Sequence, residues 1–121
     1  MTVLSNRALV EAMDVGRLRI DPRPTPAPEV IGSPFGSCSV DLHIGRTIFI
    51  PRKGLQVSLD IRGAVTPTLD ALYERREIPE EGWLLSPGRL VLGRTIEVVD
   101  LPLSENGLAA RIEGRSSFAR A

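Results

Sequence analysis

The chain has 121 residues, equal numbers of acidic and basic side chains (15 each) and 42% hydrophobic residues, which suits one domain with a modest core. A net charge of zero argues against a general binder of nucleic acids or membranes, because such partners are held by excess positive charge. No apolar stretch approaches the length that crosses a bilayer, and residues 1–10 lack the basic start and apolar core of a signal peptide. We therefore expect a cytoplasmic protein.

The first predicted element is a helix over about residues 5–15. Ser5 can cap its N-terminus through the side-chain hydroxyl, and Gly16 is suited to end it. Leu9 and Ala12 then share one face of the helix, as in a helix that packs on one side.

A proline-rich segment and several strands are expected after the helix. Alternate prolines across residues 22–28 forbid helix and central strand, so this segment is predicted to be extended and on the surface. Strict alternation of apolar and polar residues predicts half-buried strands over residues 40–44 and 55–61. Residues 90–99 supply another strand pair or one bent strand, and alternate apolar residues over 108–112 lead towards the C-terminus.

One further segment and two single residues also lead to structural predictions. Residues 69–77 are expected to form a short helical turn whose charges face solvent. Trp83 is interpreted as a core or interface anchor because leucines follow it directly. Cys38 is interpreted as a small packing residue, and as the only cysteine it can form neither an internal disulfide nor a cysteine-based zinc cluster.

Many short strands with glycine and proline between them indicate a mainly β fold, an antiparallel sandwich or barrel with one N-terminal helix. We expect a single domain over residues 1–121, with the β region at 39–121.

The last ten residues combine guanidinium groups and hydroxyls in one predicted turn. Arg115 followed by Ser116 and Ser117 offers a charged fork plus hydroxyl and amide donors to phosphate oxygens, and Arg120 adds a second fork. The turn therefore has the donors of half an anion site, although a basic, serine-rich turn can also be a solvated loop.

Three segments strengthen the anion-site interpretation by their order and spacing. They read S-V-D-L-H-I-G over residues 39–45, L-S-P-G-R-L-V-L-G-R-T-I-E over 85–97 and E-G-R-S-S-F-A-R over 113–120. Together they resemble the dCTP deaminase family, part of the superfamily that also contains the trimeric dUTPases. In that family an S-x-D-L-x-x-G strand, an L-x-P-G-x-x-x-L-x-x-T-x-E hairpin and an E-G-R-S-S-x-A-R turn follow one another. The third segment is the most specific, since dUTPases usually carry only a shorter R-S-x-x-A core.

The resemblance implies a distorted β-barrel of the dUTPase-like type and a homotrimer with active sites between subunits. It further implies binding of dCTP or dUTP, with Mg²⁺ bound through the triphosphate. Asp41 is then expected to help arrange the site, and Glu113 to accept hydrogen bonds that shape the loop. The residues that carry over as nucleotide-binding are Arg115, Ser116, Ser117 and Arg120.

Deamination at C4 of cytosine needs a water activated by a general base and a proton for the departing amine. Zinc deaminases use a metal-bound hydroxide held by histidine and cysteine ligands. This chain has one histidine, one cysteine and no H-x-E motif, so we expect no zinc. His43 and Asp41 lie two apart, yet two ligands without a third make no metal site. The family instead uses a glutamate downstream of the Arg-Ser-Ser turn, which the resemblance places beyond Ala121.

The sequence therefore indicates the N-terminal part of a zinc-independent dCTP deaminase, incomplete at its C-terminal end and inactive by itself. Two alternatives stay open. One is a dUTPase or a bifunctional dCTP deaminase and dUTP diphosphatase, in which water attacks phosphorus. The other is a non-catalytic module that binds nucleotide or forms a trimer.

Overall fold

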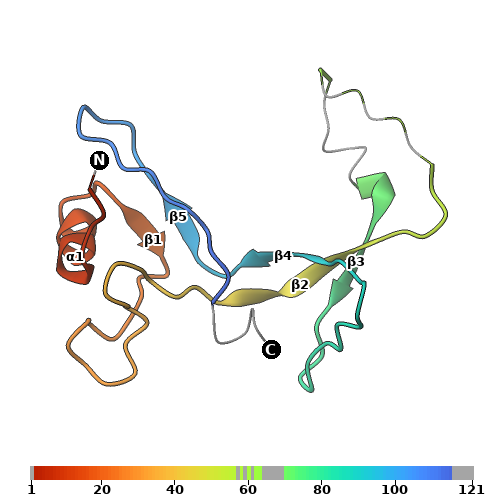
Figure 1. Cartoon of the computed structure of the whole chain (residues 1–121), viewed down its shortest axis with the longest axis horizontal. Coiled ribbons are helices and arrows are strands. Elements are labelled where there is room, and N and C mark those ends of the chain that lie inside the picture. The colour runs from red at the N-terminus through yellow and green to blue at the C-terminus, as the bar shows by residue number, and fades with distance from the viewer. Residues whose placement is uncertain (1, 57, 59, 61, 64–69, 116–121) are drawn as a thin grey trace. The chain divides into compact units, whose positions relative to one another are not determined.

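The computed structural model describes residues 2–56, 58, 60, 62–63 and 70–115 (Figure 1). Its elements are, in chain order, α1 (Asn6–Asp14), β1 (Arg19–Asp21), β2 (Ile44–Pro51), β3 (Tyr73–Glu77), β4 (Leu92–Thr95) and β5 (Val98–Asp100). The paired strands of both sheets run antiparallel. The prediction of a mainly β chain with antiparallel sheets and one short N-terminal helix is thus confirmed.

The chain divides into two units, residues 1–41 with 97–121 and residues 42–96. The first unit contains α1 and the sheet of β1 and β5, in which Ile20 lies opposite Val99. Its buried hydrophobic residues among those described are Ala12, Leu18 and Ile20. In the same unit, residues 22–28 form neither helix nor strand. No described helix is long and apolar enough to span a membrane.

The helix α1 begins and ends at the residues that the sequence predicts. Ser5 is the N-cap, and its side-chain oxygen accepts a hydrogen bond from the backbone N–H of Ala8 at 3.3 Å. Beyond the helix, Gly16 has a φ of 77°, a left-handed conformation that favours glycine. The N–H of Arg17 then donates to the carbonyl oxygen of Ala12 at 2.8 Å, which satisfies a carbonyl of the last turn.

Replacing Ser5 by alanine is expected to lower the free energy of unfolding by about 1 kcal/mol, because a helix N–H loses its acceptor. Urea denaturation followed by circular dichroism measures the change. Ser86→Ala removes the same hydroxyl at an exposed position outside the helix and is expected to change it by less than about 0.5 kcal/mol. Equal losses in the two variants would contradict the capping role.

The second unit is built on a sheet with the order β3-β2-β4. The central strand carries Ile48, which is 3% exposed and lies opposite Arg76 on one side and Gly93 on the other. The register against β4 shifts between Ile44 and Ile48. A side chain at Gly45 would place its Cβ 3.2 Å from the carbonyl oxygen of Arg94, so glycine permits this close approach.

The strand predicted over residues 40–44 is wrong in its position. Val40 forms a single bridge with Phe35, and β2 begins only at Ile44. The N–H of Asp41 donates to the carbonyl oxygen of Pro34 at 2.8 Å. A local loop therefore takes the hydrogen bonds that the alternating pattern assigned to a neighbouring strand.

The strand predicted over residues 55–61 falls partly outside the described residues, since 57, 59 and 61 are not among them. The described residues in that range lie in no strand. The Asp60 carboxylate accepts hydrogen bonds from the Arg62 side chain and backbone N–H, each at 3.0 Å. The Arg62 guanidinium, and then its backbone N–H, hold the pKa of Asp60 below its usual value. Such a side-chain bond to nearby backbone competes with a strand ladder.

The helical turn predicted over residues 69–77 is shorter than expected. Residues 70–72 are helical, while residue 69 lies outside the described residues. Tyr73–Glu77 instead forms β3, which pairs with β2. Four consecutive charged residues in β3 hide any apolar alternation, so pairing with the central strand decided the conformation.

Residues 90–99 do contain two strands, β4 and β5, but these belong to different sheets. Residues 108–112 form no strand. Trp83 is 40% exposed, so it is no core residue of the described part, and Cys38 is exposed rather than packed. The packing prediction for Cys38 is therefore wrong, while the interface alternative for Trp83 stays a prediction.

Candidate functional site

Two of the predicted site residues, Asp41 and Arg115, meet in the first unit. Nη1 of Arg115 lies 3.4 Å from Oδ2 of Asp41. Their side chains are 64% and 49% exposed respectively, so the ion pair is at the surface, where a ligand can reach it. The structure therefore brings together the aspartate of the S-x-D-L segment and the first arginine of the E-G-R-S-S segment.

The free-energy contribution of the Asp41–Arg115 ion pair determines whether an anion can replace Asp41 as the partner of Arg115. An exposed ion pair contributes about 0.2 to 1 kcal/mol. A hydrogen bond to a charged group contributes about 1.5 to 3 kcal/mol, so a phosphate can compete with Asp41 for the Arg115 guanidinium. The pair can thus orient Arg115 without locking it.

Glu113 lies two residues before Arg115 and forms an ion pair with Nη2 of Arg111. Both side chains are mostly exposed. The carboxylate of Glu113 is thereby engaged within its own segment, as a loop-shaping residue would be. Its role in a nucleotide site stays a prediction.

The remaining predicted nucleotide contacts, Ser116, Ser117 and Arg120, lie outside the described residues. Their part in phosphate binding also stays a prediction.

The backbone carbonyl of His43 accepts a hydrogen bond from the N–H of Ile96 at 2.8 Å, which ties the start of β2 to the end of β4. The His43 side chain is exposed. Within the part of the chain that the structure describes, no group of three or more His, Cys, Asp or Glu residues could hold a metal ion.

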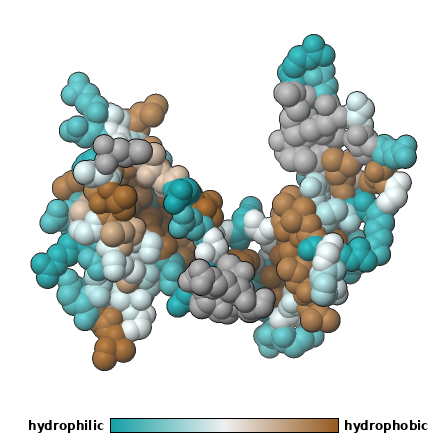
Figure 2. All heavy atoms as spheres, viewed as in Figure 1, coloured by the Kyte–Doolittle hydropathy of each residue, from teal (hydrophilic) through white to brown (hydrophobic). Residues whose placement is uncertain are grey.

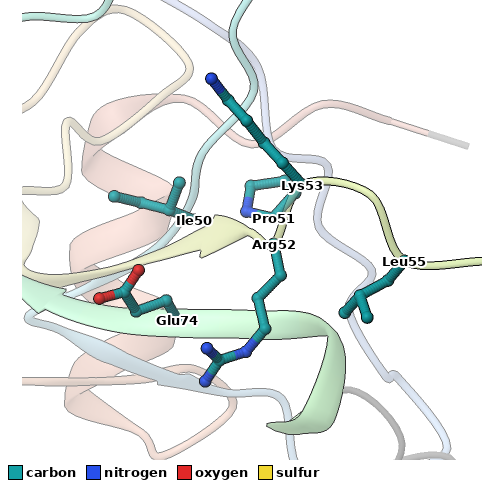
Figure 3. A pocket seen from close by; sticks show the side chains of 6 residues that line it. All are labelled: Ile50, Pro51, Arg52, Lys53, Leu55 and Glu74. Atoms are coloured by element: carbon teal, nitrogen blue, oxygen red, sulfur yellow. The ribbon is translucent and has the colours of Figure 1, made fainter.

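A shallow hollow of about 450 Å³ lies at the end of β2 in the second unit (Figure 3). It offers two cations, Arg52 and Lys53, but Figure 3 shows their side chains pointing in different directions. Its acidic residue, Glu74, pairs with Arg76 at 2.7 Å. The lining residues are Ile50, Pro51, Arg52, Lys53, Leu55 and Glu74. Because the two cations do not converge, the geometry of this hollow does not favour the binding of one phosphate by both.

Sequence reasoning assigned no role to Glu97, the last residue of the segment 85–97. Its side chain is 8% exposed, the only buried charged one among the residues described, and it is engaged with other groups. Burial of a carboxylate is costly unless it is hydrogen-bonded or paired. The sequence feature that could have indicated this burial is the position of a charged residue between two apolar strand segments.

A sequence model described as dCTP deaminase-like matches residues 3–121. The chain is 37% identical over 122 residues to a protein of Dictyoglomus thermophilum named "dCTP deaminase, dUMP-forming", covering 98% of this chain and 56% of that protein. It is also 37% identical over 121 residues to a dCTP deaminase of Rhodospirillum rubrum, covering 97% and 57%. The chain thus spans about half the length of the curated relatives that it matches.

Proposed function

Because the chain belongs to the dCTP deaminase-like family, we propose that it supplies the nucleotide-binding part of an enzyme that hydrolyses dCTP to dUTP and ammonia. The proposed assembly is the homotrimer of dUTPase-like barrels that the resemblance implies. Its active sites lie between subunits, and the enzyme acts in the cytoplasm.

The observation that carries this proposal is the ion pair between Asp41 and Arg115, at 3.4 Å. It places the guanidinium of the proposed phosphate turn beside a carboxylate from another family segment, at an exposed site. A guanidinium held in this way presents its planar donor fork to the oxygens of a phosphate. Ser116, Ser117 and Arg120 are proposed to complete the set of phosphate donors.

The proposed reaction adds water to C4 of the cytosine ring and expels the amino group as ammonia, which leaves a carbonyl at C4. A general base takes the proton of the water, and the departing amine receives one. We assign the base to the part of the relatives' length that this chain does not span. Mg²⁺ bound through the triphosphate oxygens would neutralise part of the phosphate charge. Since this chain has one histidine and one cysteine, we propose that the reaction does not use zinc.

A second candidate is favoured by the name of one relative, "dCTP deaminase, dUMP-forming". In that case the chain would also serve hydrolysis of the triphosphate to dUMP and pyrophosphate, with water attacking phosphorus. The same phosphate turn serves both reactions, so product analysis distinguishes them.

Calorimetric titration of the protein with dCTP and with deoxycytidine, both with Mg²⁺, tests the proposed phosphate contacts. We expect dCTP to bind at least about tenfold more tightly, since one charged hydrogen bond contributes about 1.5 to 3 kcal/mol and about 1.4 kcal/mol is a factor of ten. Equal affinity for nucleoside and triphosphate would contradict the proposal.

A further inference from the structure

An asparagine followed directly by a glycine lies in an exposed turn after β5. In this turn, residues 104–107, the N–H of Gly107 donates to the carbonyl oxygen of Ser104 at 3.0 Å. All four residues are exposed, and Figure 2 shows hydrophilic atoms at the tip of the loop that follows β5 in Figure 1. Asparagine and glycine are common turn residues. The turn therefore leaves the side-chain amide of Asn106 in contact with solvent.

An exposed Asn-Gly pair can react with itself and with water. The nitrogen of Gly107, once it has lost its proton, bonds to Cγ of Asn106, and the side-chain amino group leaves as ammonia. The product is a five-membered succinimide ring. Glycine favours this attack because it has no Cβ to obstruct it. The bond from Gly107 to Ser104 must first open, as hydrogen bonds in exposed turns readily do.

Water then opens the succinimide ring at one of its two carbonyl groups. Attack at the former side-chain carbonyl gives aspartate. Attack at the main-chain carbonyl gives isoaspartate, in which the backbone runs through the side chain and the α-carboxylate is free. In both cases one amide and one water become one carboxyl group and one ammonia, so no oxidant or reductant is needed.

Arg17 contacts the carbonyl group that distinguishes the two products. Its Nη2 donates to the backbone carbonyl oxygen of Asn106 at 2.7 Å. A donor placed on a carbonyl oxygen stabilises the negative charge that develops there when water attacks. Arg17 therefore favours ring opening at the main-chain carbonyl, which yields isoaspartate.

A second atom of Arg17 fits the same product. In the part of the chain that the structure describes, Nε of Arg17 is a buried side-chain nitrogen without a hydrogen-bond partner. Leaving a buried donor unpaired is costly. Nε and Nη2 form one edge of the guanidinium, and a carboxylate can accept from both where a carbonyl oxygen accepts from one. The α-carboxylate of isoaspartate thus suits this edge better than the carbonyl that it replaces.

We propose that Asn106 is a site of spontaneous deamidation and that Arg17 directs the product towards isoaspartate. The reaction uses water alone and is independent of the proposed nucleotide chemistry. It adds one negative charge to a chain whose net charge is zero.

The test keeps the wild-type protein in mildly alkaline buffer and analyses tryptic peptides by liquid chromatography and mass spectrometry, which separate aspartyl from isoaspartyl forms. Asn106 lies in peptide 95–111, and Asn6, the only other asparagine, lies in peptide 1–7 and serves as an internal control. Asn6 begins α1 and is followed by Arg7. We expect Asn106 to convert at least about tenfold faster than Asn6, because an exposed turn opens more readily than a helix and glycine obstructs attack least. Equal rates, or no conversion at Asn106, would overturn the proposal.

The role of Arg17 is tested by the ratio of isoaspartate to aspartate at Asn106. We expect Arg17→Gln to lower this ratio at least about threefold, because the charged donor is lost. Arg19→Gln is the matched control, since Arg19 pairs instead with Asp100 at 3.0 Å, and it should change the ratio by less than about 1.5-fold.

Urea provides a comparison that needs no variant. Unfolding separates Arg17 from Asn106, so the wild-type ratio in urea should fall to that of the Arg17→Gln protein measured in the same urea. The same wild-type ratio with and without urea would overturn the directing role of Arg17, as would an unchanged ratio in a folded Arg17→Gln protein.

Discussion

The 121-residue chain by itself is expected to release no measurable ammonia or uridine nucleotide from dCTP. The general base that the family uses is not assigned to any residue of this chain, and loss of a general base typically lowers the rate by about 10² to 10⁴. The chain also spans only about half the length of the relatives that it matches. Chromatography of the nucleotides and an enzymatic ammonia assay measure the result, with the Rhodospirillum rubrum relative as the positive control.

Glu113 is the carboxylate whose involvement would contradict this expectation. It forms an ion pair with Arg111 in the structure, so we assign it to loop shape rather than to proton transfer. Uridine nucleotide formed by the wild type and abolished by Glu113→Gln would show that this carboxylate is the base.

Replacing Arg115 by alanine is expected to weaken dCTP binding by one to two decades. The variant loses a charged hydrogen bond to the triphosphate, which contributes about 1.5 to 3 kcal/mol, and about 1.4 kcal/mol corresponds to a factor of ten. Loss of the ion pair with Asp41 changes the free energy of dCTP binding little, because both of its side chains are largely exposed. Calorimetric titration with dCTP measures the loss, and a parallel titration with deoxycytidine should show a much smaller one.

Arg111→Ala is a matched control for Arg115→Ala. It removes an arginine from the same segment, 84% exposed and paired with Glu113, that we do not assign to the phosphate. We expect its dCTP affinity to stay within about threefold of the wild type, as for a surface substitution. If the Arg115→Ala protein instead lost affinity for the nucleoside and for the triphosphate equally, the role of Arg115 would be to stabilise the fold or to contact the cytosine base.

The helix could be predicted from sequence because its signals are local. The hydroxyl that caps α1 and the glycine that follows it act within one turn, at Ser5 and Gly16. The strands could be predicted only in part, because alternation specifies an extended backbone and not its partner. Residues 40–44 show this limit, since a loop bond to Pro34 replaces the expected ladder. The strand β3 escaped prediction because pairing, rather than an apolar period, determines it.

For the candidate site too, features within one segment could be predicted from the sequence, whereas contacts between distant segments could not. The residue types and spacing of the last segment indicated a phosphate turn, and the resemblance added Asp41 as a supporting residue. The contact between Asp41 and Arg115 could not be predicted, because it depends on the path of the chain between segments far apart in sequence. The burial of Glu97 was missed for the same reason.

The most direct test of the central claim is the product that a chimera forms from dCTP. In the chimera, residues 3–121 of this chain replace the matching stretch of the Rhodospirillum rubrum dCTP deaminase. We predict that it forms dUTP and ammonia in equal amounts and that Arg115→Ala strongly reduces the yield. A chimera that binds dCTP as tightly as its parent but leaves the nucleotide unchanged would contradict the claim that this chain supplies part of a deaminase active site.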